Sequence, residues 1–271
     1  MIDLEIRNKV QLHYNETLNH FGERAIPWVT MLFGSQNYGL DTPLSDVDTK
    51  TMLIPPVNDI ILGKEKISED FFTSTGEVAQ CKDFRKMFGE YLKGNVNFLE
   101  TLYTEWYVVY PFLDDFFTRL RRERDLIANA HPQRLMNMCA AMARQKGKMF
   151  SHPTPATAEV IGRLGYNPKE LVHICRLECF MRMYSQGHKF EKCLRPKPAE
   201  AEFMRGLKLN PMELKQAEEV RDEVLDMVDT HLVWSKSNMP LEKDAAAAEE
   251  FFDDLTVDMF ARFYEWEYPH D

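Results

Sequence analysis

Two aspartates one residue apart, Asp46 and Asp48, follow a Gly-Ser turn at Gly34 and Ser35, and these residues are the part of the sequence best suited to chemistry. The segment 49–54 after the aspartates has the composition of a strand and ends at a proline. Side chains at i and i+2 of a strand point to the same face, so we expect both carboxylates to converge on one small volume. Adjacent carboxylates repel each other unless they share a cation. Carboxylate oxygens and substrate phosphates are typical ligands of Mg²⁺.

The turn before the aspartates is suited to holding an anion. Its backbone N–H groups and the Ser35 hydroxyl can point at a phosphate, and Gly34 allows a close approach of the backbone. Ser45 either orients the carboxylates or begins the strand. An anion cradle beside a metal clamp is typical of enzymes that transfer phosphoryl or nucleotidyl groups. Each piece alone is common in ordinary loops, so the prediction depends on their joint occurrence within positions 34–48.

These motifs resemble a known superfamily. Gly34-Ser35, Gly39 and Ser45-Asp46-x-Asp48 look like the active-site motif of the polymerase-β-like nucleotidyltransferases. Further segments, in the same order, resemble the narrower RlaP group, which is associated with RNA repair: Arg85-Lys86, Leu92-Lys93-Gly94-Asn95 with Asn97 and Glu100, Lys169 with His173 and Arg176-Leu177, and Met204-Arg205-Gly206. The resemblance covers most of the chain. It implies an α+β fold, with a mixed sheet flanked by helices and an all-helical C-terminal domain.

Hydrophobic periodicity agrees with a change of architecture near Pro111. Before it, the pattern predicts a helix over 3–22, strands over 28–33, 49–54, 77–81 and 107–110, a helix over 83–92, and an irregular segment over 55–74. After it, the pattern predicts helices over 114–128, 131–150, 168–186, 211–233 and 245–266. Asn-Pro pairs at 167–168 and 210–211 are helix start signals. We therefore predict a catalytic domain over 1–112 and a helical domain over 113–271.

Nucleotidyl transfer needs charge stabilisation on both the attacking and the leaving oxygens, which two metal ions supply. The resemblance implies two Mg²⁺ ions, replaceable by Mn²⁺, an NTP substrate such as ATP, and a third carboxylate besides Asp46 and Asp48. Glu77 is our choice for that carboxylate, because it opens a strand after Gly76. Asp83 is the fallback, although its position suits a helix cap better.

A cationic stripe in the second half provides further candidates. Lys169, His173 and Arg176 follow i, i+4, i+7 spacing and so share one face of a helix. Together with Gly34, Ser35 and Ser45 they form the predicted nucleotide-binding set, and they would contact phosphates of the NTP or of the acceptor. The alternative is pairing with Glu170, Glu178 or acids of the first domain.

The charge and composition of the chain limit the kinds of partner that we expect it to bind. The formal charge is −10, from 43 acidic and 33 basic residues, which argues against broad non-specific binding of nucleic acid. Basic tracks at 119–124, 144–148 and 189–197 are candidates for a local contact or ordinary solvated helix faces. No run of 18 apolar residues and no secretory h-region appear, so we expect no membrane partner and a cytoplasmic location. The five cysteines, including the pair Cys175 and Cys179, are interpreted as reduced, buried thiols.

The leading hypothesis is an enzyme, a Mg²⁺-dependent nucleotidyltransferase that moves a nucleoside monophosphate from an NTP to a hydroxyl, with an RNA 3′ end, of a tRNA or a repair substrate, as acceptor. A second hypothesis keeps this chemistry and changes the acceptor to a protein side chain or a small molecule, as in AMPylation. A third is a catalytically silent nucleotide-binding scaffold. The presence of both aspartates counts against silence.

Overall fold

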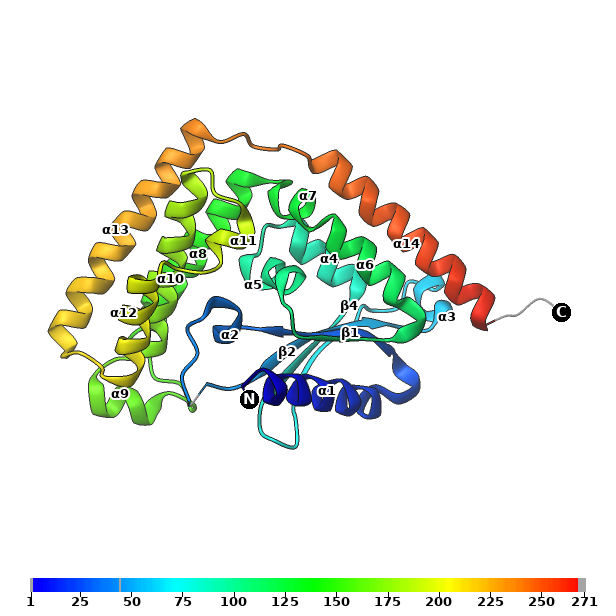
Figure 1. Cartoon of the computed structure of the whole chain (residues 1–271), viewed down its shortest axis with the longest axis horizontal. Helices are drawn as coiled ribbons and strands as arrows, with labels where there is room; N and C mark the ends of the chain where they lie inside the picture. Colours follow the sequence, from blue (N-terminus) through cyan, green and yellow to red (C-terminus); the bar gives the residue numbers. More distant parts are fainter. Residues whose placement is uncertain (1, 44, 268–271) are drawn as a thin grey trace. The chain divides into compact units, whose positions relative to one another are not determined.

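The computed structural model describes residues 2–43 and 45–267 (Figure 1). Its single sheet has five strands in the order β3-β4-β2-β1-β5. The strands are β1 (Ile26–Phe33), β2 (Asp48–Ile54), β3 (Ser68–Phe72), β4 (Val78–Asp83) and β5 (Tyr107–Val109). β2 and β4 run parallel and the other neighbours are antiparallel, so the sheet is mixed. In the described chain every element after β5 is helical, which confirms the predicted α+β class with a helical C-terminal part.

The chain divides into two compact units that interleave in sequence. The first comprises Met1–Gly34, Asp46–Ala130 and Asp244–Asp271, and the second comprises Ser35–Ser45 and His131–Lys243. The boundary between the units therefore cuts the Gly-Ser turn, and the last helix belongs with the sheet. The division into domains 1–112 and 113–271 stays a prediction, and the compact units divide the chain at other residues.

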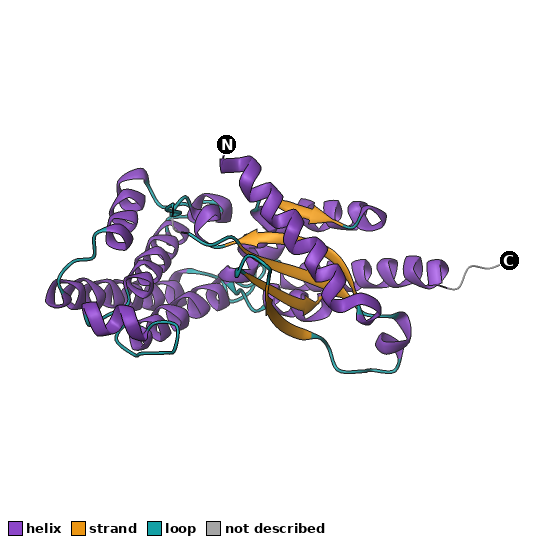
Figure 2. Ribbon diagram, turned by 90° about the horizontal axis from the view of Figure 1, so that it is seen from below, coloured by secondary structure: helices purple, strands orange, loops and turns teal. Residues whose placement is uncertain are grey.

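Helices cover both faces of the sheet in the first unit (Figures 1 and 2). α1 (Ile2–Phe21) lies along one face, where Phe21 packs with Leu53, Ala79 and Cys81. On the other side lie α4 (Phe84–Leu92), α6 (Asp114–Arg122), α7 (Arg124–Asn129) and α14 (Ala245–Glu267). Short pieces complete the unit: α3 (Val57–Ile61), α5 (Val96–Leu99), and 3₁₀ turns at Gly22–Arg24, Glu100–Tyr103 and Pro111–Leu113.

α14 returns to the sheet unit through aromatic packing. Phe252 is buried and stacks on Phe88 of α4 with ring centroids 4.3 Å apart. It also stacks on Tyr91, at 6.3 Å. Burial of these aromatic rings explains why a helix so distant in sequence folds with residues 46–130.

The second unit is a helical cluster around α10 (Pro168–Ser185), which packs against α8 (Pro132–Met149), α12 (Pro198–Leu209) and α13 (Leu214–Asn238). Smaller helices are α2 (Ser35–Tyr38), α9 (Ala158–Leu164) and α11 (Phe190–Cys193). Asn167 caps α10 by accepting from the Lys169 N–H at 3.0 Å, as the Asn-Pro signal predicts. The five cysteines are buried and carry free thiols, as expected.

Three predictions about elements were wrong. Residues 55–74 are not irregular, because they contain α3 and the edge strand β3, which pairs with β4. The helix expected over 114–128 is two helices, α6 and α7, interrupted at Glu123. The second Asn-Pro signal, at 210–211, does not open a helix, since α13 begins at Leu214. None of the helices among the described residues is both long and apolar enough to cross a bilayer.

Candidate active site

The paired aspartates lie at the end of the sheet where β1 leaves it. β2 begins at Asp48, which lies opposite Phe33, the last residue of β1. Asp46 precedes the strand and is exposed, so the prediction that both aspartates lie on the strand was wrong. The physical reason is that Gly34, with a φ of +97°, turns β1 out of the ladder and leaves residues before Asp48 without a partner strand. Burial raises the pKa of Asp48, and the charges of Asp46 and Glu77 raise it further.

Gly34 follows Phe33, so the pairing of Phe33 with Asp48 brings Gly34 close to Asp48. The Gly34 N–H donates to Oε2 of Glu100, at 3.3 Å. Ser35 opens α2 and its hydroxyl donates to Gln36 Oε1, at 3.3 Å. Ser45 accepts from the Thr42 N–H at 2.9 Å and so closes the turn before Asp46. Gly34 and the aspartates belong to the first unit, whereas Ser35 and Ser45 belong to the second.

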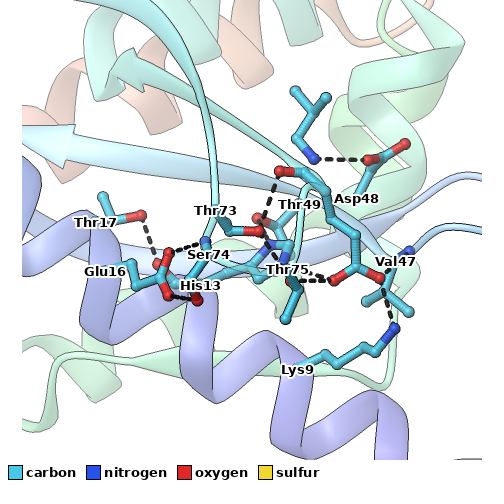
Figure 3. A network of polar contacts seen from close by, with 12 residues as sticks. Lys9, His13, Glu16, Thr17, Val47, Asp48, Thr49, Thr73, Ser74 and Thr75 are labelled. Carbon is cyan, nitrogen blue, oxygen red and sulfur yellow. Dashed lines mark hydrogen bonds and ion pairs between the residues drawn. The ribbon is translucent and has the colours of Figure 1, made fainter.

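The Glu77 carboxylate contacts four groups, two of which are Lys9 and His13 of α1. All four partner residues are labelled in Figure 3. Its Oε1 accepts from Lys9 Nζ at 2.6 Å and from the Val47 N–H at 3.1 Å. Its Oε2 accepts from the Thr75 hydroxyl at 2.8 Å and lies 3.3 Å from Nε2 of His13. Burial would raise the pKa of Glu77, but the hydrogen bonds from Lys9, Thr75 and Val47 outweigh it and hold the pKa below its ordinary value.

The third carboxylate is not preassembled with the pair. Within the part of the chain that the structure describes, no group of three or more His, Cys, Asp or Glu side chains is placed to hold a metal ion. Asp83 lies at the opposite end of β4 from the residues level with Asp48, roughly 16 Å away at the usual rise per residue. It caps α4, accepting from the Arg85 N–H at 2.9 Å, which confirms the capping interpretation. The metal role of Glu77 stays a prediction.

A buried lysine accompanies Asp48 on the same face of β2. Lys50 is 3% exposed, and its ammonium donates to Gln80 Oε1 and lies 3.3 Å from the centroid of the Phe33 ring. Burial lowers the pKa of Lys50 to about 8, against the opposing charge of Glu100. This face of the sheet therefore carries a carboxylate, a desolvated ammonium and an amide side by side.

The cationic stripe of α10 forms as predicted, and more cations surround it. Lys169 is exposed, His173 is half-buried, and Arg176 is buried with its guanidinium 4.1 Å from the centroid of the Tyr38 ring. Burial lowers the pKa of His173 well below its ordinary value, and the charges of Arg176, Lys146, Lys208 and Lys169 add to this effect. Two carboxylates considered as alternative partners contact other residues: Glu170 pairs with Lys146, and Glu178 with Arg182 and His231. The role of the stripe in nucleotide binding stays a prediction.

Basic side chains of the helical unit hold the loop that follows Ser35. Arg195 Nε donates to the Asn37 carbonyl at 3.3 Å, and Arg205 Nη1 donates to the Gly39 carbonyl at 2.6 Å. Lys208 Nζ donates to the Leu40 carbonyl at 2.8 Å. Three cations on three carbonyls of one loop fix its backbone, so these residues position the loop that contains the Gly39 part of the motif.

Several residues of this neighbourhood were missed in the sequence analysis. Lys9 and His13 lie on α1 more than 60 positions before Glu77, and only their i, i+4 spacing hinted at a shared target. Lys50 carried a stronger signal, because a lysine within the strand-like run 49–54 and two residues after Asp48 is unusual for a buried strand.

Comparisons with known proteins give little beyond this geometry. No protein-family model and no curated protein match the chain. Among solved structures, one similar chain is a nucleotidyltransferase-like protein from Exiguobacterium sibiricum. It is 13% identical, the alignment covers 95% of this chain and 91% of that one, and the TM-score is 0.29. A score of this size carries no argument about function.

Proposed function

We propose that this protein is a Mg²⁺-dependent nucleotidyltransferase that moves a nucleoside monophosphate from an NTP to a hydroxyl acceptor. The observation that carries the proposal is the register of β1 and β2. It sets Asp48 opposite Phe33, so that the Gly34 turn and the Asp46-Val47-Asp48 segment lie side by side at one end of the sheet. This arrangement joins an anion-binding turn to a pair of acidic ligands.

The acidic pair suits a divalent cation. Asp46 is exposed and Asp48 is half-buried, with a pKa raised by burial and by the negative charge of its neighbour. A cation shared by the two carboxylates would relieve that repulsion. Mg²⁺ is commonly held by one or two carboxylates together with substrate phosphates, so two aspartates suffice as protein ligands. When bound, the metal supplies charge stabilisation for the attacking and leaving oxygens.

The chain's own residues supply the remaining functions. Asp46 and Asp48 would hold the metal. Gly34 and Ser35 bind terminal phosphates through backbone N–H groups and the hydroxyl. Phosphate binding at Gly34 requires its N–H to exchange Glu100 for a phosphate oxygen. Ser45 fixes the turn that leads into Asp46.

The α10 stripe is proposed as a second phosphate contact. Lys169 and Arg176, with Lys208 close enough to depress the pKa of His173, concentrate positive charge in a protein whose net charge is −10. His173, kept neutral by these cations, adds a ring that can form hydrogen bonds. Like charges in one region repel each other, and an anion bound among them would offset that repulsion. A triphosphate or the phosphates of an acceptor would be such an anion.

The proposed acceptor is the 3′ hydroxyl of an RNA. A second candidate, a protein or small-molecule hydroxyl, is favoured by the ion pairs within the basic tracks. Arg119 pairs with Asp258 at 2.7 Å, and Arg144 pairs with Asp229 at 2.6 Å. These pairs reduce the positive surface open to a phosphate backbone.

One experiment tests both the activity and the acceptor. The protein is incubated with Mg²⁺, α-³²P-labelled NTPs and either total RNA or a protein and metabolite extract. The Asp46→Ala/Asp48→Ala double variant serves as the matched control. We expect label in RNA that is lost with the double variant or with EDTA. Label in protein or metabolites would select the second acceptor class. Absence of transfer, with NTP binding retained, would overturn the enzymatic proposal in favour of a nucleotide-binding scaffold.

A further inference from the structure

The hydrogen bonds around Glu77 point to a role different from the one its residue type suggests. We propose that Glu77 is a positioning residue: through the Val47 N–H it sets the backbone between the two metal-binding aspartates, and it does not bind the metal itself. This inference rests on the proposed function. It deepens that function, because it limits the protein ligands of the metal to Asp46 and Asp48.

The acceptor sites of the Glu77 carboxylate are already occupied by donors. An ionised carboxylate has about four acceptor sites, and Glu77 has four donor contacts: Lys9 Nζ, the Val47 N–H, the Thr75 hydroxyl and His13. The residue is only 6% exposed. Binding a metal would displace at least one of these donors. The Val47 N–H and His13 are buried, so loss of their partner would be unfavourable, and the Lys9 ammonium, 2.6 Å from Oε1, would repel the ion.

Glu77 and Asp48 also point to opposite faces of the sheet. In the β2–β4 ladder Thr49 lies level with Ala79, so Glu77 shares the face of Ala79 and Cys81. That face packs against α1. Asp48 shares the opposite face with Lys50, whose ammonium contacts the Phe33 ring.

The backbone group that Glu77 holds lies between the two aspartates. Val47 is the residue between Asp46 and Asp48, and its N–H belongs to the peptide that joins it to Asp46. The next residue, Val78, donates its N–H to Asp48 Oδ1 at 3.0 Å. Residues 77 and 78 therefore fix both the peptide after Asp46 and the carboxylate of Asp48.

Side chains of α1 make further contacts in this network (Figure 3). His13 is fully buried and links β2 to Glu77, with Nδ1 2.9 Å from the Thr49 hydroxyl and Nε2 3.3 Å from Glu77 Oε2. Glu16 accepts from the Ser74 N–H at 2.9 Å and ties the turn before Glu77 to the same helix. The position of the Val47 peptide, between the two aspartates, thus depends on α1 through the contacts of Lys9 and His13 with Glu77.

The test compares two substitutions of Glu77. In Glu77→Gln the amide oxygen can accept from Lys9 and Val47, and the amide NH₂ can donate to Thr75 and to a neutral His13 nitrogen. A positioning role therefore predicts that Glu77→Gln retains kcat within about threefold, whereas Glu77→Ala loses about 10–100-fold, the usual effect of removing a partner behind a metal ligand.

Two readouts do not depend on turnover. Mn²⁺ affinity, measured by electron paramagnetic resonance without nucleotide, should be unchanged within about threefold in Glu77→Gln. The ¹H,¹⁵N signal of the Val47 amide should stay close to its wild-type position in Glu77→Gln and move upfield in Glu77→Ala. Glu69→Ala is a matched control, because Glu69 of β3 also joins the sheet to His20 of α1 and to Arg24, and it lies opposite Cys81, away from the end of β4 where Val78 contacts Asp48. It should leave both readouts unchanged.

The outcomes separate this inference from the proposed function. A tenfold or larger loss of Mn²⁺ affinity in Glu77→Gln, with the Val47 signal in place, would show that Glu77 is a ligand and overturn the inference. An unmoved Val47 signal in Glu77→Ala would overturn it as well. If Asp46→Ala and Asp48→Ala leave Mn²⁺ binding unchanged, it is the proposed function that fails. Glu77→Gln conserves shape, so the comparison survives even if Glu77→Ala does not fold.

Discussion

Replacement of Asp83 tests whether its carboxylate is structural, as its place at the far end of β4 requires. Asp83 is fully buried, accepts from the Arg85 N–H as the cap of α4, and receives Arg85 Nε at 2.9 Å and Nη2 at 2.5 Å. Loss of an N-cap costs about 1 kcal/mol. Removal of one partner from a buried ion pair costs about 3–5 kcal/mol, and the lower end applies because the Arg85 side chain is 18% exposed.

Asp83→Ala should therefore lower the free energy of unfolding by about 4 kcal/mol. Asp83→Asn keeps the capping oxygen and one acceptor for Arg85 but loses the charge, so it should cost about 2 kcal/mol or less. Urea denaturation of the wild type and both variants measures these values, and a double-mutant cycle with Arg85→Met isolates the pair. A loss below about 1 kcal/mol in Asp83→Ala would refute the reasoning. So would a folded Asp83→Asn protein that binds Mn²⁺ at least tenfold more weakly, because Asp83 would then be a metal ligand.

Three further outcomes are expected. Burial and cationic neighbours lower the pKa of His173, so between its folded pKa and the ordinary value near 6.5 the unfolded state binds more protons, and the free energy of unfolding falls as the pH falls. In urea titrations at pH 7.5 and 5, the wild type should lose more stability on acidification than His173→Gln. Equal losses in the two proteins would contradict this. Phe252→Ala should lower the free energy of unfolding by about 3–5 kcal/mol, because it removes a buried ring stacked on Phe88; a change below about 1 kcal/mol would show that α14 is not part of the sheet unit's core. Gly165→Ala should lower the free energy of unfolding, measured by thermal denaturation, by about 1–2 kcal/mol. Gly165 ends α9 at a φ of +79°, and a Cβ there would lie 2.8 Å from a methyl group of Leu214. An unchanged Tm would contradict the assigned backbone conformation.

Local patterns were sufficient for most of the elements. The helix over 3–22, the strand before Gly34 and the Asn167 cap of α10 were predicted because each depends on nearby residues: an apolar periodicity, a β-prone run, or a side chain that bonds its own backbone. Edge strand β3 was missed for the converse reason. Its sequence is charged and half-exposed, and it becomes a strand by pairing with β4.

The candidate site shows the same difference between what nearby residues determine and what depends on the folded chain. The sequence by itself determined the chemistry on offer, because Asp46, Asp48 and the Gly34 turn are contiguous and their residue types limit what they can bind. Only the tertiary structure decided how these groups are held. The side-chain period of two in a strand makes the face of Glu77 depend on the register of β2 against β4, and that register brings Glu77 to Lys9 and His13 of α1. A contact between residues more than 60 positions apart leaves no trace in either local sequence, so it takes the folded chain to distinguish a metal ligand from the residue that positions one.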